Sequence, residues 1–199
     1  HWEQVYTTKA TTEVSWFQAH ARMSLKLIQA AGTPASAAIL DVGGGASVLV
    51  EDLLAQGFAD LTVLDISGAA LAAARARMGA QAARVKWIEA SILEAGLPAE
   101  AFDVWHDRAV FHFLTAAEDR QAYVRQLARA LKPGGLVLLA TFAEDGPAKC
   151  SGLPVVRYGA EGLQAELGAA FTLLGQEREA HQTPFGTEQK FIYCTFRKA

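Results

Sequence analysis

The sequence of 199 residues is poor in several features that would mark a specialised class of protein. Its two cysteines, Cys150 and Cys194, are too few for a disulfide framework and fit a reducing compartment. No apolar run is long enough to cross a bilayer, and the N-terminus lacks a signal-like order of charged and then apolar residues. The formal net charge of −3 argues against a bulk attraction to nucleic acid or anionic lipid. We therefore expect a cytoplasmic protein without a nucleic-acid or membrane partner.

The residues that are present are those of an ordinary globular chain, 51% hydrophobic and 20% charged. No composition break or repeat divides the sequence, so a single domain over 1–199 is expected. Short apolar runs alternate with segments of helical periodicity, which predicts a parallel sheet with helices on both faces. The expected strands cover 37–42, 61–66, 84–90, 101–106, 136–143, 171–180 and 190–196, and the last two can pair antiparallel.

Helix boundaries are predicted from capping residues and glycines. Ser47 and Ser67 are placed to cap two helices that stop at glycines, and Thr115 with Glu118 has the spacing of a capping box. The helix after Thr115 should run to Leu131 and end at the sequence KPGG. The other helices are expected over 15–32, 48–56, 68–78 and 160–168.

The sequence DVGGGAS, residues 41–47, lies at the carboxyl end of the first predicted strand and opens a helix. In parallel sheets of this kind, ligands bind outside the carboxyl ends of the strands, and glycines allow the backbone to approach them closely. A dinucleotide-binding G-x-G-x-x-G turn counted from Gly43 would require glycine at position 48, where the chain has Val48. A nicotinamide cofactor is therefore disfavoured.

With Asp41, Gly43 and Gly45, this turn resembles the D-x-G-x-G-x-G motif of class I S-adenosylmethionine-dependent methyltransferases, with Ser47 in place of the third glycine. The sequence LKPGG before a strand and an antiparallel final pair are also features of that family. The resemblance implies a Rossmann-like, doubly wound α/β fold whose seven-stranded sheet is mostly parallel, with an antiparallel C-terminal strand. It also implies S-adenosylmethionine as cofactor, S-adenosylhomocysteine as product, a helical lid over 1–32 and a core over 37–199.

The resemblance also implies which residues hold the cofactor. Asp65, at the end of the second strand, stands where the family binds the ribose hydroxyls, and a carboxylate suits two adjacent donors because both of its oxygens accept. Ser91 and Ile92 stand where the family contacts adenine. Trp16 either contacts the cofactor from the lid or packs the first helix on the sheet. The cofactor-binding residues expected are Trp16, Asp41, Gly43, Gly44, Gly45, Asp65, Ile66, Ser91, Ile92 and His106.

The stretch VWHDRAVFHFL, residues 104–114, places ionisable residues in an apolar run at the end of the fourth strand. It is similar to the Asp-Arg segment of thiopurine and thiol methyltransferases and, more loosely, to the Asp-Lys-Gly segment of lysine methyltransferases. His106, Asp107 and His112 are candidates for proton transfer, although His112 fits a role in bridging backbone groups better. The two histidines are six residues apart rather than four, so no metal site is expected.

The expected function is transfer of a methyl group to a small-molecule nucleophile, a thiol or another heteroatom. Arg108, Cys150 and Arg157 are the candidate substrate-binding residues. Two alternatives stay open: methylation of protein lysine, and a regulatory module that binds the cofactor without catalysis.

Overall fold

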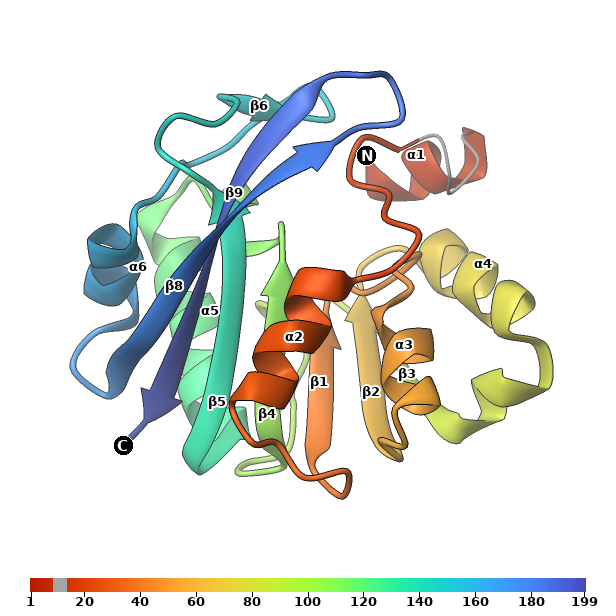
Figure 1. Ribbon diagram of the computed structural model, residues 1–199, viewed down its shortest axis with the longest axis horizontal. Helices are drawn as coiled ribbons and strands as arrows, with labels where there is room; N and C mark the ends of the chain where they lie inside the picture. The colour runs from red at the N-terminus through yellow and green to blue at the C-terminus, as the bar shows by residue number, and fades with distance from the viewer. Residues whose placement is uncertain (9–13) are drawn as a thin grey trace.

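The computed structural model describes residues 1–8 and 14–199, and its main sheet has the strand order β3-β2-β1-β4-β5-β9-β8 (Figure 1). The strands β1 to β5 pair parallel, whereas β9 pairs antiparallel with both β5 and β8. This arrangement confirms the predicted seven-stranded α/β sheet. The strands are β1 (Ala38–Val42), β2 (Asp60–Asp65), β3 (Val85–Glu89), β4 (Phe102–Arg108), β5 (Leu131–Phe142), β8 (Phe171–Gln182) and β9 (Glu188–Lys198).

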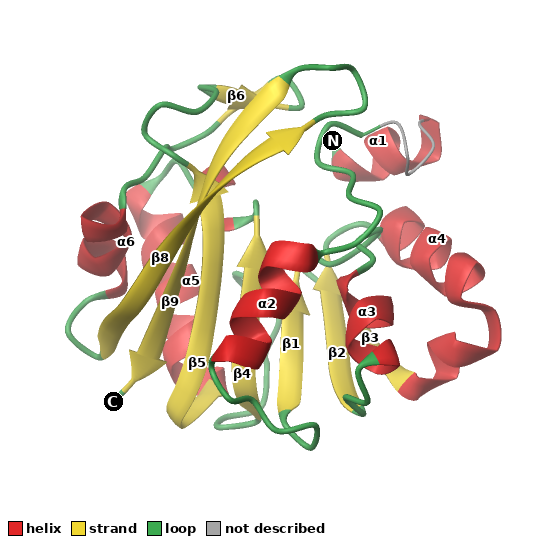
Figure 2. Ribbon diagram, viewed as in Figure 1, coloured by secondary structure: helices red, strands yellow, loops and turns green. Residues whose placement is uncertain are grey.

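Helices cover both faces of the sheet (Figure 2). One apolar cluster joins the sheet to α2 and α3 through Ile28 and Leu49, and a second joins it to α5 and α6 through Leu127 and Leu163. Burial on both faces explains why all five residues of β1 are buried, since such a strand has no solvent-facing side. The α-helices are α1 (Trp2–Thr8), α2 (Arg22–Ala30), α3 (Leu49–Ala55), α4 (Gly68–Met78), α5 (Ala117–Ala130) and α6 (Ala160–Leu167). None of these helices is long and apolar enough to span a membrane.

The order of the strands locates a crevice at one edge of the sheet. The strand β1 pairs with β2 on one side and with β4 on the other, so the chain winds outward in two directions from β1. The helices that follow β1 and β4 therefore diverge, which leaves a crevice beyond the carboxyl ends of these strands. The helix α1 lies over this end of the sheet, next to α4 (Figure 1).

The helix predicted over 15–32 is shorter in the structure. It is α2, which covers only Arg22–Ala30, so Trp16 and Phe17 precede it. The reason is tertiary, because the His181 ring donates a hydrogen bond to the carbonyl of Ser15 and Arg108 donates one to that of Trp16. These contacts hold the segment 14–18 against the sheet in a non-helical path. Residues 9–13 of the predicted lid lie outside the described residues.

Two of the predicted caps are wrong and one is confirmed. The Ser67 hydroxyl accepts the hydrogen bond of Ala70 N and caps α4 as expected. The Ser47 hydroxyl accepts a hydrogen bond from Leu49 N, but the N-cap of α3 is the next residue, Val48. The predicted capping box is absent, since Ala116 is the cap of α5.

The C-terminal half also differs in two details. The strand β5 begins at Leu131 rather than at 136, because Leu131 already pairs with Phe102 before a register shift absorbs the KPGG turn. A small hairpin of β6 (Lys149–Cys150) and β7 (Leu153–Pro154), for which the sequence pattern gave no signal, follows β5.

Candidate active site

The glycine turn after β1 is packed so tightly that only glycine fits it. Gly43 has a φ of +67°, and a Cβ there would collide with Val110. A Cβ at Gly44 or Gly45 would collide with the carboxylate of Asp41 or Asp65, respectively. The turn therefore lies directly against Val110 and these two carboxylates, which leaves no room for a side chain at any of the three glycines.

Asp65 ends β2 and ties it to the glycine turn. One carboxylate oxygen accepts from Gly45 N at 3.0 Å and the other from Ser67 N at 2.8 Å. The residue is 6% exposed, and this burial raises its pKa to about 6, against the opposing effect of the two backbone donors. The carboxylate lines a cavity, so a ligand there meets an acceptor that is ionised at neutral pH.

That cavity has a volume of about 260 Å³ and two kinds of wall. Asp65, Ile66, Ser91 and Ile92 form one end, where the sequence predicted a nucleoside. Ile66 is 57% exposed, which is unusual for a large apolar side chain and suits a surface that a ligand covers. The rest of the lining includes four aromatic side chains, those of Trp2, Tyr6, Trp16 and Phe113, together with Arg108, Val110, Leu114 and Cys150.

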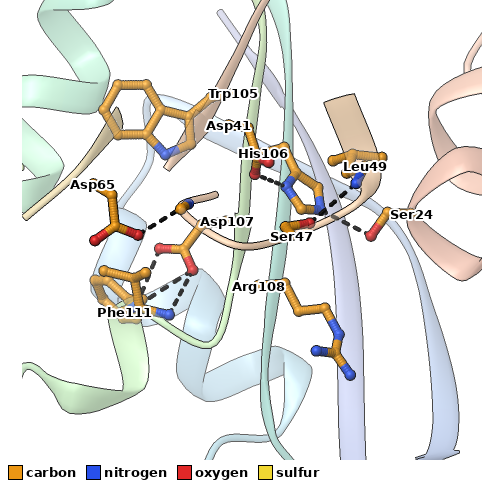
Figure 3. Close-up of polar contacts among 12 residues, drawn as sticks. Ser24, Asp41, Ser47, Leu49, Asp65, Trp105, His106, Asp107, Arg108 and Phe111 are labelled. Carbon is orange, nitrogen blue, oxygen red and sulfur yellow. Dashed lines mark hydrogen bonds and ion pairs between the residues drawn. The ribbon is translucent and has the colours of Figure 1, made fainter. Parts of the chain in front are cut away.

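A second, smaller cavity of about 50 Å³ lies against a buried polar network (Figure 3). His106 Nδ1 is 2.7 Å from Asp41 Oδ1, and Nε2 is 2.8 Å from the Ser24 hydroxyl. Because a carboxylate only accepts, the ring donates through Nδ1 to Asp41, and its Nε2 shares the second hydrogen bond with the Ser24 hydroxyl. All three residues are at most 4% exposed. Among the described residues, Asp41 Oδ2 has no hydrogen-bond partner, so the network leaves one buried acceptor beside the cavity for a donor on a ligand.

The other two candidates for proton transfer do not line either cavity. The Asp107 carboxylate is fully buried and accepts hydrogen bonds from Tyr123 Oη at 2.6 Å and from Val110 N at 2.8 Å. Burial raises its pKa to about 6. His112 accepts from Phe142 N, and burial lowers its pKa to about 3, so the ring is neutral. Both residues hold the loop after β4 in place, and His106 has a hydrogen bond at each ring nitrogen.

Of the three predicted substrate-binding residues, the structure brings two to the larger cavity. Arg108 lines it, but its guanidinium is held by the Tyr193 hydroxyl and the Trp16 carbonyl and lies 3.8 Å from Glu179. Cys150 also lines it, and burial raises the pKa of its thiol to about 11. Arg157 is exposed, donates to the Gly146 carbonyl and lines neither cavity.

An N-terminal lid, made of α1 and the segment 14–18, completes the site. Trp2 packs edge to face against Trp16 and Phe113, with ring centroids 5.6 and 4.9 Å apart. The carboxylate of Glu3 accepts from the Ser67 hydroxyl at 2.8 Å and from Ala69 N at 3.1 Å, at the start of α4. These contacts fasten α1 beside the crevice.

The aromatic residues near the N-terminus, Trp2, Tyr6, Trp16 and Phe17, predicted a lid, because aromatic side chains without basic neighbours suit one, but only Trp16 was expected to contact the cofactor. Trp2 and Tyr6 also line the larger cavity, as does Phe113, which was not predicted to belong to the site. Ser24 carried no signal, since nothing in a helical pattern distinguishes a serine that faces a histidine 82 residues away.

Comparison with known proteins supports the family resemblance. A family described as "Methyltransferase domain" matches residues 39–135, which include β1 to β4 and the glycine turn. The chain is 34% identical over 116 residues to the PKS-NRPS hybrid synthetase cheA of Chaetomium globosum, covering 55% of this chain and 2% of that protein. It is 24% identical over 155 residues to the EEF1A lysine methyltransferase 2 of Homo sapiens, covering 71% of this chain and 66% of that protein. The chain thus spans less than two thirds of either relative.

A solved structure shows the same fold. It is the 1,6-didemethyltoxoflavin-N1-methyltransferase of Burkholderia thailandensis, with 1,6-didemethyltoxoflavin and S-adenosylhomocysteine bound. The TM-score is 0.72 at 22% identity, over 98% of this chain and 81% of that chain. Residues 39–135, which include the glycine turn and the carboxylate that follows β2, thus match a methyltransferase domain, and the chain as a whole shares the fold of the toxoflavin enzyme.

Proposed function

We propose that this chain transfers a methyl group from S-adenosylmethionine to a small-molecule nucleophile. The observation that carries the proposal is the continuous lining around the two cavities, which runs from the carboxylate of Asp65 past the glycine turn to Asp41 and is closed by aromatic residues. The residues fit the cofactor chemically, since they offer a carboxylate for a diol, apolar contacts for a base and an orphaned acceptor for an ammonium.

The cofactor would lie across the carboxyl ends of β1, β2 and β4. Asp65 would accept hydrogen bonds from the two ribose hydroxyls, while Ile66 and Ile92 would pack against the adenine and Ser91 would lie at its edge. At the other end, Asp41 Oδ2 would accept from the amino group of the methionine part, beside the backbone of Gly43 and Gly44. His106 and Ser24 would act indirectly, because their hydrogen bonds fix the orientation of the Asp41 carboxylate.

When bound, the cofactor supplies a methyl group on a positively charged sulfur. A lone pair of the acceptor forms the new bond to the methyl carbon, and the electrons of the broken carbon–sulfur bond stay on sulfur. The chain's own residues position the acceptor and exclude water around it. His112 and Asp107 do not face the cavities, and both ring nitrogens of His106 are engaged. These positions support an acceptor that reacts without help from these three groups, such as a thiolate or a neutral heteroatom.

The lid favours a small molecule over a protein lysine. With α1 fastened to α4, Trp2 and Tyr6 wall the larger cavity, and its acceptor side is apolar and aromatic. Such walls suit a compact apolar acceptor, whereas a lysine side chain on a folded protein must reach past the lid. The toxoflavin enzyme acts on a small molecule, whereas the Homo sapiens relative is named for lysine methylation. A small-molecule acceptor and a protein lysine must therefore be distinguished by experiment.

The test is incubation of the protein with cofactor carrying a labelled methyl group, together with a metabolite extract and, separately, a protein extract. We expect label in a small organic molecule and none in protein. Label in protein lysine would contradict the small-molecule acceptor, and measurable cofactor binding without any transfer of label would indicate a regulatory module. The Asp65→Asn protein is the control, because any label that appears with this variant does not depend on the cofactor site.

A further inference from the structure

The two cavities of the site meet at a wall that they share. The residues that line both of them are Tyr6, Trp16, Val42, Gly43 and Arg108. In the proposed binding mode the larger cavity takes the nucleoside and the smaller one takes the methionine part. The sulfur atom joins these two parts covalently, so it must lie beside the residues that the cavities have in common.

The shared residues differ in what they can offer to a positively charged sulfur. Val42 and Gly43 form the floor at the end of β1. The Arg108 guanidinium carries a like charge; Tyr193 and Trp16 hold its Nε and Nη1, while Nη2 lies 3.8 Å from Glu179 and has no hydrogen-bond partner among the described residues. Among the side chains of these residues, only those of Tyr6 and Trp16 bring electron-rich groups, and both belong to the lid.

Tyr6 is held in a defined orientation by Trp16. The indole Nε1–H donates to the phenolic oxygen at 3.1 Å, and the two ring centroids are 6.2 Å apart. This bond uses one lone pair of the oxygen and leaves the other for a ligand. Burial and the negative charge of Asp65 raise the pKa of Tyr6 above its usual value, so the phenol stays neutral across the physiological range.

A methyl group on a sulfonium has polarised C–H bonds and carries positive charge, so it interacts favourably with oxygen lone pairs and aromatic faces. The product S-adenosylhomocysteine has neither the charge nor the methyl group. Building on the proposed function, we infer that Tyr6, oriented by Trp16, contacts the methylsulfonium of the bound cofactor and is a catalytic residue of this chain. The contact makes the lid selective for the cofactor over its product and aligns the methyl group for transfer.

The experiment measures the affinity of S-adenosylmethionine and of S-adenosylhomocysteine by calorimetry for the wild type, Tyr6→Phe and Tyr158→Phe. Tyr6→Phe keeps the ring and its packing, so we expect its Kd for the cofactor to rise about three- to tenfold while its Kd for the product stays within twofold. Tyr158→Phe is the matched control, because it removes the hydroxyl of a buried tyrosine that lines neither cavity. It should leave the ratio of the two Kd values unchanged.

If Tyr6 had only a structural role, its substitution would weaken the binding of both ligands equally. An unchanged ratio of the two Kd values in Tyr6→Phe would therefore overturn the inference while leaving the proposed function intact. A wild-type protein that binds neither compound would overturn both. Thermal melting of each variant checks that it is folded, and Trp16→Phe, which removes the N–H donor from Tyr6, should shift the ratio in the same direction.

Discussion

Asp65 is the residue on which cofactor recognition depends most in this account. Replacing it with Asn keeps the shape but halves the accepting capacity, and the new amide N–H₂ faces a backbone donor at Gly45 or Ser67. We expect Asp65→Asn to raise the Kd for S-adenosylhomocysteine by about 10- to 100-fold, since a hydrogen bond to a charged group contributes about 1.5–3 kcal/mol. Calorimetry measures the change. Asp60→Asn, at the solvent-exposed start of β2, is the control and should bind normally.

The raised pKa of Asp65 predicts how binding depends on pH. In the free protein this carboxyl takes up a proton below about pH 6, and the neutral acid can no longer accept two hydrogen bonds. The Kd for S-adenosylhomocysteine should therefore be constant above pH 7 and rise by up to about tenfold for each pH unit below 6. The Asp65→Asn protein should bind weakly with a flat profile. A wild-type Kd that is independent of pH between 5 and 8 would exclude Asp65 as the ribose ligand.

Asp107 is predicted to act on stability. Its carboxylate accepts from Val110 N, Phe111 N and Tyr123 Oη, so Asp107→Asn leaves a buried donor unsatisfied and should lower the free energy of unfolding by about 1–3 kcal/mol. Burial raises the pKa of Asp107 to about 6 in the folded state, so its favourable contribution is present at low pH and is lost as pH rises through 6. Urea unfolding should therefore show a larger difference between the two proteins at pH 5 than at pH 8. A difference that shrinks at pH 5 would contradict this assignment.

Among the elements, the N-terminal lid is the one that sequence patterns described least well. The apolar spacing from Phe17 to Ile28 predicts a long helix, but only Arg22–Ala30 is helical. The segment before it is fixed by the C-terminal strands, where His181 and Gln189 bind Ser15. Contacts across more than 160 residues leave no local periodicity, so they could not be predicted. The strands β1 and β2 were predictable because each is a buried, largely apolar run bounded by turn residues.

The lid should control the rate at which the cofactor leaves. Glu3 is the polar link of α1 to α4, and hydrogen bonds from Ala69 N and Ser67 Oγ lower its pKa, so it is ionised at neutral pH. We expect Glu3→Ala to raise the dissociation rate of S-adenosylhomocysteine by about three- to tenfold in stopped-flow measurements, because it removes both hydrogen bonds that fasten α1 to the start of α4. Gln4→Ala, one residue along the same exposed helix, is the control. Equal dissociation rates in Glu3→Ala and the wild type would show that α1 does not gate the site.

For the whole molecule, sheet order follows from the alternation of strands and helices, and it brings Asp41, Asp65 and His106 to one edge. That part of the site was predictable, because parallel strands end at the same side of a sheet. The roles of the individual residues within the site could not be predicted. The ring of His106 is oriented toward the buried Asp41 carboxylate by its second hydrogen bond, to Ser24, and no sequence spacing connects these two residues. The positions of the lid residues likewise depend on tertiary contacts.

A crystal structure of the protein grown with S-adenosylhomocysteine tests the binding mode directly. We expect the ligand across the carboxyl ends of β1, β2 and β4, with both ribose hydroxyls on the Asp65 carboxylate and the amino group on Asp41 Oδ2. A crevice that stays empty at saturating ligand, or a ligand whose ribose lies away from Asp65, would contradict it.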